Sequence, residues 1–174
     1  MDHRQYQISY FSPDGRVLPL VRAFYQMLPE NTLVSNLEEE EKPAGDIQLV
    51  GFDYARTNLK AIPIQVMEYR YKLEGKVIFL FATVPFQPND TVEGQIHRHT
   101  VAFLPRECDF RGIYLCSAQP SDALLRNMEE IVSQHPENSR AKHWLERFMC
   151  AAGHPDSADI QQGCRFMKHV LELA

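Results

Sequence analysis

The sequence predicts an α/β fold, a three-layer sandwich in which helices cover both faces of a five-stranded parallel sheet. Three observations support this prediction. Segments typical of strands alternate with segments of helical periodicity along the 174 residues. Residues 76–83 (KVIFLFAT) are nearly continuously apolar, which is typical of a strand buried on both faces. No repeat, low-complexity tract or shift in composition divides the chain, so we expect one domain over residues 1–174.

The chain begins with a strand and a helix. Residues 5–11 (QYQISYF) are rich in aromatic and β-branched residues, and the turn-forming residues Ser12–Gly15 follow them. Apolar residues then recur at helical spacing over 17–28, where Pro19 is tolerated because it falls in the first turn. A short strand is predicted over 32–36.

The middle of the chain starts with a run of four acids, Glu38–Glu41. Adjacent like charges repel one another, so this run predicts an exposed loop. Residues 46–52 (DIQLVGF) predict the third strand. The apolar spacing predicts a helix over 58–73 with Pro63 near its start, and the apolar run 76–83 is the fourth strand.

The last part of the chain contains one strand and four helices. A helix is predicted from Asn89 or Asp90 to Phe103, and residues 111–116 (RGIYLC) predict the fifth strand. Three further helices from about residue 121 onward close and extend one side of the fold. The segment 154–156 (HPD) predicts the entry of the last helix, with Asp156 as its cap.

Composition excludes several classes of protein. Hydrophobic residues make up 44% and charged residues 24%, so the chain is neither disordered nor fibrous. A formal charge of −5 is unfavourable for binding nucleic acid, whose affinity comes largely from Lys and Arg. No Cys-x-x-Cys pair, signal-peptide core or membrane-spanning run is present, so we expect a cytoplasmic protein with reduced thiols and no membrane partner.

In open parallel sheets, ligands bind outside the carboxyl ends of the strands, where the strand order reverses. The loops at that edge are predicted over 12–17, 53–58 and 83–89. These segments also carry a family resemblance. ISYFSPDGR resembles the first strand and phosphate loop of the flavodoxin family, DIQLVGFDYAR its third strand and the following aromatic loop, KVIFLFAT its fourth strand, and RGIYLCSAQ its fifth.

The resemblance implies the strand order 2-1-3-4-5, with FMN as cofactor and electron transfer as function. The tail (GHPDSADIQQGCRFMKHVL) is similar to a bacterial flavodoxin-like subgroup, some members of which are encoded beside reductases such as bilirubin reductase. The resemblance therefore implies a redox partner protein or a reductase as partner. It places the cofactor site at Ser12, Asp14, Gly15, Arg16, Val17, Tyr54, Ala55, Thr83, Pro85 and Phe86.

Within this implied site, the phosphate would be held by Ser12, Gly15, Arg16 and Val17. The flavin ring would be held by Tyr54, Ala55 and Phe86, with Tyr54 and Phe86 able to stack on it. Typical members carry S-x-T-G-N-T where this chain has SPDGRV. Pro13 has no N–H to donate. Asp14 would repel a phosphate oxygen about 4 Å away by roughly 4 kcal/mol. Arg16 would offset this by binding the phosphate, or Asp14 would turn away and cap the helix.

The loop 83–89 departs from the family as well, because Pro85 and Pro88 cannot donate to the flavin. Tyr54 and Phe86 have an alternative role as aromatic residues that pack on the edge of the sheet. Three functions therefore stay open. The first is an FMN-binding electron carrier, with acids of the 29–55 region forming a docking rim for a basic partner. The second is a cofactor-less interaction or regulatory subunit. The third is a flavin-dependent NAD(P)H or quinone reductase, although no G-x-G-x-x-G is present.

Overall fold

The computed structural model describes residues 4–39, 45–54 and 62–173. Its centre is a five-stranded sheet in the order β2-β1-β3-β4-β5, and all neighbouring strands are parallel. The predicted fold class and strand order are therefore confirmed. The strands are β1 (Tyr6–Phe11), β2 (Leu33–Asn36), β3 (Ile47–Asp53), β4 (Val77–Val84) and β5 (Asp109–Ser117).

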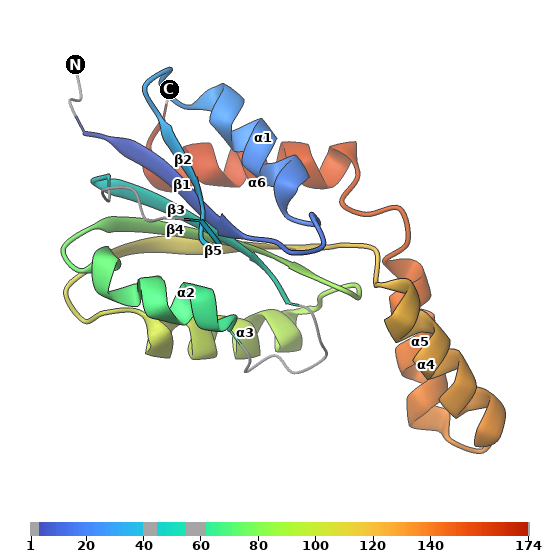
Figure 1. Ribbon diagram of the computed structural model, residues 1–174. Coiled ribbons are helices and arrows are strands. Elements are labelled where there is room, and N and C mark those ends of the chain that lie inside the picture. Colours follow the sequence, from blue (N-terminus) through green and yellow to red (C-terminus); the bar gives the residue numbers. More distant parts are fainter. Residues whose placement is uncertain (1–3, 40–44, 55–61, 174) are drawn as a thin grey trace.

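Helices cover both faces of the sheet (Figure 1). One face carries α1 (Leu18–Met27) and α6 (Ser157–Leu171), and the other carries α2 (Ile64–Tyr69), the 3-10 turn η1 (Arg70–Leu73) and α3 (Asp90–Phe103). Two apolar clusters match this arrangement, one on each side of the sheet. All seven residues of β3 are buried, as expected for a strand covered by helices on both faces.

Two predicted elements differ from the structure. The predicted helix 58–73 begins only after Pro63, and residues 58–61 lie outside the described part of the chain. Pro63 has the non-helical ψ of 140°, and the residue before a proline is itself disfavoured in the helical region, so the helix cannot extend back through Ile62. The fifth strand is longer than the predicted 111–116, and a bulge lies between its pairings at Phe110 and Gly112.

The remaining two helices, α4 (Asp122–Gln134) and α5 (Ser139–Cys150), form a hairpin between β5 and α6. Ser121 and Asn138 cap them by accepting from the backbone N–H of Leu124 and Ala141. The hairpin projects beyond the carboxyl ends of the strands, outside both helical layers (Figure 1). It therefore lies beside the edge at which the sequence predicts a ligand.

Candidate functional site at the carboxyl edge of the sheet

The carboxyl ends of β1, β3 and β4 bring three polar side chains together. Ser12 follows β1, Asp53 ends β3, and Thr83 is paired with Asp53 in the sheet. Ser12 Oγ donates a hydrogen bond of 2.6 Å to Asp53 Oδ2, and Thr83 Oγ1 donates one of 2.8 Å to Asp53 Oδ1. The carboxylate is only 3% exposed. Both aliphatic hydroxyls of the predicted site, those of Ser12 and Thr83, thus serve an internal acid.

Asp53 is an unusual group at this position because it is a buried acid. Burial raises the pKa of Asp53 above its ordinary value, since desolvation disfavours the charged form. The hydrogen bonds from Ser12 and Thr83 act in the opposite direction, as do the backbone N–H and the positive charge of nearby Arg16. The carboxylate therefore lies where donors from three segments converge, as an anionic ligand would.

The N-terminus of α1 has its backbone donors already satisfied. The N–H groups of Gly15 and Leu18 donate to Ser12 O and Gly15 O, and the N–H of Val17 donates to Ser12 Oγ at 3.3 Å. Pro19 has no N–H, and Leu20 donates to Val17 O. The N–H of Arg16 lies against Asp53. A phosphate normally binds at such a helix start through free N–H groups.

The charged side chains of this loop pair with each other. Arg16 Nη1 lies 3.0 Å from Asp14 Oδ2, and the arginine is mostly covered whereas Asp14 is half exposed. The predicted alternative of Asp14 as the helix cap is wrong, because Val17 occupies the cap position and no side chain caps α1. Gly15 adopts a φ of +71°, which only glycine adopts without strain, and so permits this tight turn.

Tyr54 lies inside the fold, on the side of the sheet covered by α2 and α3. It is 2% exposed, and its ring packs edge-on against Phe52 with centroids 5.1 Å apart. Burial raises the pKa of Tyr54, while the nearby Thr100 hydroxyl of α3 lowers it. Its hydroxyl meets no partner with hydrogen-bond geometry among the described residues. The ring thus lies under α3.

Phe86 is also buried, and α5 covers it. Trp144 packs edge-on against the Phe86 ring with centroids 5.4 Å apart, and the Arg147 guanidinium lies 4.7 Å from the centroid of the same ring. Arg147 also donates a hydrogen bond of 3.0 Å to the carbonyl oxygen of Gln87. Pro85 is buried beside it. The α4–α5 hairpin therefore covers the loop after β4, and both rings predicted to stack on the flavin are buried against protein side chains in this structure.

Two parts of the predicted site lie outside the described residues. These are Ala55 and half of the acidic run, of which Glu38 and Glu39 are described. Asp53 was counted among the acids of the docking rim, but its burial removes it from any surface of this structure. Asp53 is absent from the cofactor site that the sequence predicts. The signal was an acid at the carboxyl end of a largely apolar strand, where an unpaired charge is rarely tolerated.

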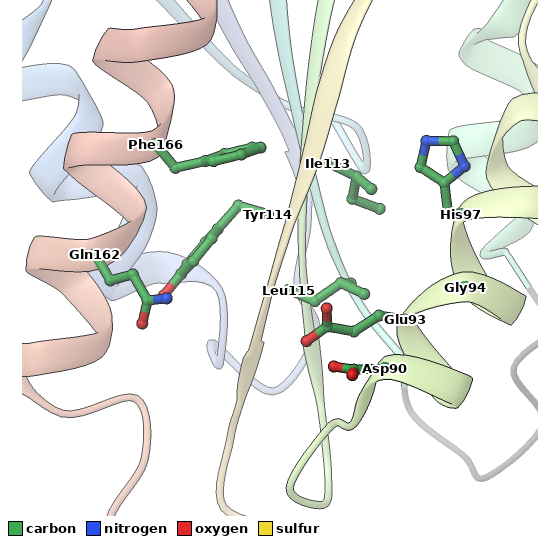
Figure 2. Close-up of a pocket in the computed structure, with 9 residues that line it drawn as sticks. All are labelled: Asp90, Glu93, Gly94, His97, Ile113, Tyr114, Leu115, Gln162 and Phe166. Carbon is green, nitrogen blue, oxygen red and sulfur yellow. The ribbon is translucent and has the colours of Figure 1, made fainter.

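A separate groove lies along the outer edge of β5, between α3 and α6 (Figure 2). Its volume is about 510 Å³. It is lined by Asp90, Glu93, Gly94, His97, Ile113, Tyr114, Leu115, Gln162 and Phe166. None of these residues belongs to the predicted cofactor site.

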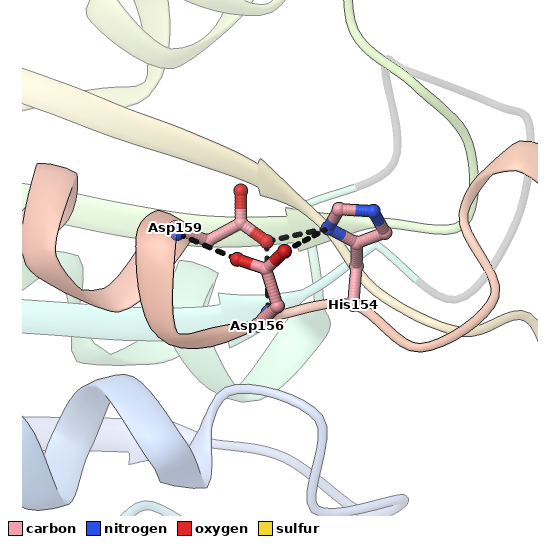
Figure 3. A group of neighbouring side chains, drawn as sticks. All are labelled: His154, Asp156 and Asp159. Carbon is pink, nitrogen blue, oxygen red and sulfur yellow. Dashed lines mark hydrogen bonds and ion pairs between the residues drawn. The ribbon is translucent and has the colours of Figure 1, made fainter.

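His154, Asp156 and Asp159 form a cluster at the start of α6 (Figure 3). Asp156 caps the helix as predicted, because its side chain accepts from the N–H groups of Ala158 and Asp159. Asp159 accepts in return from the Asp156 N–H, and its carboxylate lies 2.6 Å from His154 Nδ1. Helix capping thus accounts for the cluster, since these carboxylate contacts serve the backbone and the neighbouring imidazole.

The donor set of the carboxyl edge does not fit the phosphate of FMN. A bound dianion needs free N–H groups and hydroxyls. Here the hydroxyls of Ser12 and Thr83 donate to Asp53, and the N–H groups at the start of α1 have internal acceptors. A phosphate would also face two carboxylates, Asp53 and Asp14. We therefore derive no chemistry through a flavin in this structure.

Comparisons with known proteins agree with the architecture. The profile of the flavodoxin domain matches residues 7–168. The chain is 21% identical over 171 residues to the flavodoxin-like domain-containing protein BilS of Clostridium symbiosum (strain WAL-14163), and the match covers 90% of each protein. It also resembles the structure of a short-chain flavodoxin associated with a non-canonical PDU bacterial microcompartment, with a TM-score of 0.58 at 10% identity, over 98% of this chain and 99% of the other. By its strand order and its match over most of its length, the chain belongs to the flavodoxin domain family.

Proposed function

We propose that this protein is a flavodoxin-fold interaction subunit that works through contact with a partner protein and without bound FMN. The observation that carries the proposal is the buried carboxylate of Asp53. It accepts from Ser12 and Thr83 at the position where the family's phosphate loop begins. The cover of α5 over Phe86 supports it, because that ring is buried against Trp144 and Arg147.

A flavin titration tests the cofactor part of this proposal. Purified protein is titrated with FMN and, separately, with riboflavin, while flavin fluorescence is followed. We expect no saturable binding of FMN up to several hundred micromolar. The Asp53→Asn variant removes the negative charge and one of the two acceptor oxygens, which releases one hydroxyl donor. It should therefore bind FMN at least about tenfold more tightly, a change of roughly 1.4 kcal/mol.

Asp14→Asn is the matched control for this experiment. It also removes one carboxylate charge from the loop, but Asp14 accepts no hydrogen bond from Ser12 or Thr83, and its partner is Arg16. It should therefore improve FMN binding much less than Asp53→Asn. Tight binding of FMN by the unmodified chain would overturn the proposal.

The interaction part needs a second measurement. The tagged chain is isolated from the cells that produce it, and any partner present in stoichiometric amount is identified, purified and recombined with the flavin-free chain. We expect the complex to re-form without flavin. A complex that forms only after FMN is added would contradict the proposal.

A second candidate function is an FMN-dependent electron carrier serving a reductase. Its support is membership of the flavodoxin domain family together with Arg16, a cation beside the phosphate loop. If this function holds, Arg16→Ala should weaken FMN far more than riboflavin, because only FMN carries the phosphate. Equal losses for the two flavins would exclude Arg16 as a phosphate ligand. Reduction of a quinone by NAD(P)H with the purified protein alone would indicate a reductase.

A further inference from the structure

We propose that the groove along β5 binds an extended basic segment of the partner protein, which adds to the sheet as a sixth strand. This inference rests on the proposed interaction role and names the surface and the chemistry of the partner. The groove is defined by the outer edge of β5, the first turns of α3 and the middle of α6 (Figure 2).

The outer edge of β5 has backbone groups available for a new strand. Among the described residues β5 pairs only with β4, so its other side is an edge of the sheet. The N–H of Ala118 donates to Val84 O of β4. Successive residues of a strand direct their backbone groups to alternate sides, so Ile113 and Leu115 direct theirs outward, into the groove.

Two walls limit the occupant to a single extended chain. Ile113 and Leu115 point toward α3, whereas Tyr114 points toward α6 (Figure 2). Phe166 of α6 provides an apolar surface on that second side, and Gly94 leaves the α3 wall low because it has no side chain. A volume of about 510 Å³ lies within the range of 300–1,000 Å³ usual for binding pockets.

The two walls differ in charge, and this difference determines which kinds of residue the partner segment should carry on each of its faces. Asp90 and Glu93 on α3 are exposed, and neither forms an ion pair with another described residue. An added strand directs alternate side chains to opposite faces. Residues facing α3 should therefore be Lys or Arg, and those facing Phe166 should be apolar. The partner segment is an alternating basic and apolar strand.

A second copy of this chain suits the groove less well. The bulge between Phe110 and Gly112 interrupts regular pairing and limits the regular edge to residues 112–117. Bulges at an edge disfavour pairing between the edges of two sheets. Two copies would also bring together two chains of net charge −5. A short basic segment needs only the regular edge 112–117, and its charge is opposite to that of this chain.

A peptide titration monitored by amide NMR tests this assignment. The probe is the acetylated, amidated hexapeptide Lys-Val-Lys-Thr-Lys-Val, and the matched control replaces each Lys by Glu. We expect the basic peptide to shift the amide signals of Ile113 and Leu115 with a sub-millimolar Kd and to slow their hydrogen exchange at least tenfold. The acidic peptide should leave both signals unchanged.

Charge reversal on α3 provides the second arm. Glu93→Lys should weaken the basic peptide at least tenfold, because it replaces the attractive charge of an exposed residue by a repulsive one. Glu68→Lys is the control, since Glu68 is exposed on α2 and lies outside the groove. It should leave the Kd unchanged.

Three results would overturn the assignment. The first is that the amide signals of Ile113 and Leu115 do not change at 5 mM basic peptide, and the second is that both peptides bind equally. The third is that these amides become protected as the chain dimerises with rising concentration, which would show that a second copy pairs with the edge of β5. The flavin titration tests the proposed function and does not depend on any of these three results. A chain that binds neither peptide nor FMN loses the groove assignment and keeps the proposed function, whereas a chain that binds FMN loses the proposed function.

Discussion

At the scale of single residues, Asp53 has the largest consequences for function. It ends a strand whose seven residues are all buried, and it takes the hydrogen bonds of Ser12 and Thr83. An unpartnered buried carboxylate is strongly destabilising, so these donors are needed to keep it in place. The same contacts make them unavailable to an external phosphate. One side chain therefore links the stability of the sheet edge to its capacity for a ligand.

The raised pKa of Asp53 predicts a pH dependence of stability. The folded state binds this proton more readily than the unfolded state, so the contribution of Asp53 to the free energy of unfolding falls as pH rises from about 3.8 through the raised pKa. Asp53→Asn has no such proton. The variant should therefore gain stability relative to the unmodified chain over that pH range, so that its free energy of unfolding increases by comparison.

Urea unfolding at a series of pH values from 4 to 7 measures this difference. The sign of its slope is the informative quantity, because any effect of the substitution that does not involve the proton of Asp53 shifts the difference equally at every pH. A difference that stays constant over the series would show that Asp53 titrates alike in both states.

At the scale of elements, α5 determines how the loop after β4 is used. Phe148 is fully buried and packs against Trp144, which in turn contacts Phe86. The hairpin is thus attached to the sheet through aromatic side chains of one helix. By contrast, α4 contains no buried residue.

Substitutions in α5 test this attachment. Phe148→Ala should lower the free energy of unfolding by about 3–5 kcal/mol, because it leaves a cavity under the hairpin. Met149→Ala, at the neighbouring position, is the matched control. Met149 is 62% exposed, so its truncation should change stability by no more than about 0.5 kcal/mol. Similar effects of both substitutions in urea unfolding would contradict the packing of α5 on the loop.

At the scale of the whole molecule, the burial of the elements predicts an order of local stability. The central strands β3 and β4 are almost entirely buried, whereas α4 has only half-buried or exposed residues. The stability of the molecule therefore rests on the helix-covered sheet, and the hairpin is attached at its edge.

Among the described residues, no helix is long and apolar enough to cross a membrane.

Native-state hydrogen exchange should show this order. Amides of α4 should exchange by local opening at least about 100-fold faster than amides of β3 and β4, which require global unfolding. Helix α6 is the control, because Gly163 and Met167 are buried against the sheet. Its amides should be protected more strongly than those of α4. Equal protection of α4 and β3 would mean that the hairpin and the sheet unfold as one unit.

The sequence by itself determined the fold class, because the periodicity of apolar residues is local information. The run 76–83 and the alternation of strands and helices predicted the covered parallel sheet, and Asp156 was recognised as a helix cap from its neighbours alone. The resemblance to flavodoxins supplied the strand order, which the structure confirms. Pro63 was the local signal that was underestimated, since it sets the start of α2.

Only the tertiary structure decided how the predicted site is used. Asp53, Ser12 and Thr83 are far apart in the chain and meet because three parallel strands end at one edge. The cover of Phe86 by Trp144 and Arg147 depends in the same way on a helix about 60 residues later. Burial and hydrogen-bond partners arise from contacts between distant segments, so the sequence could indicate the edge but not whether its donors were free.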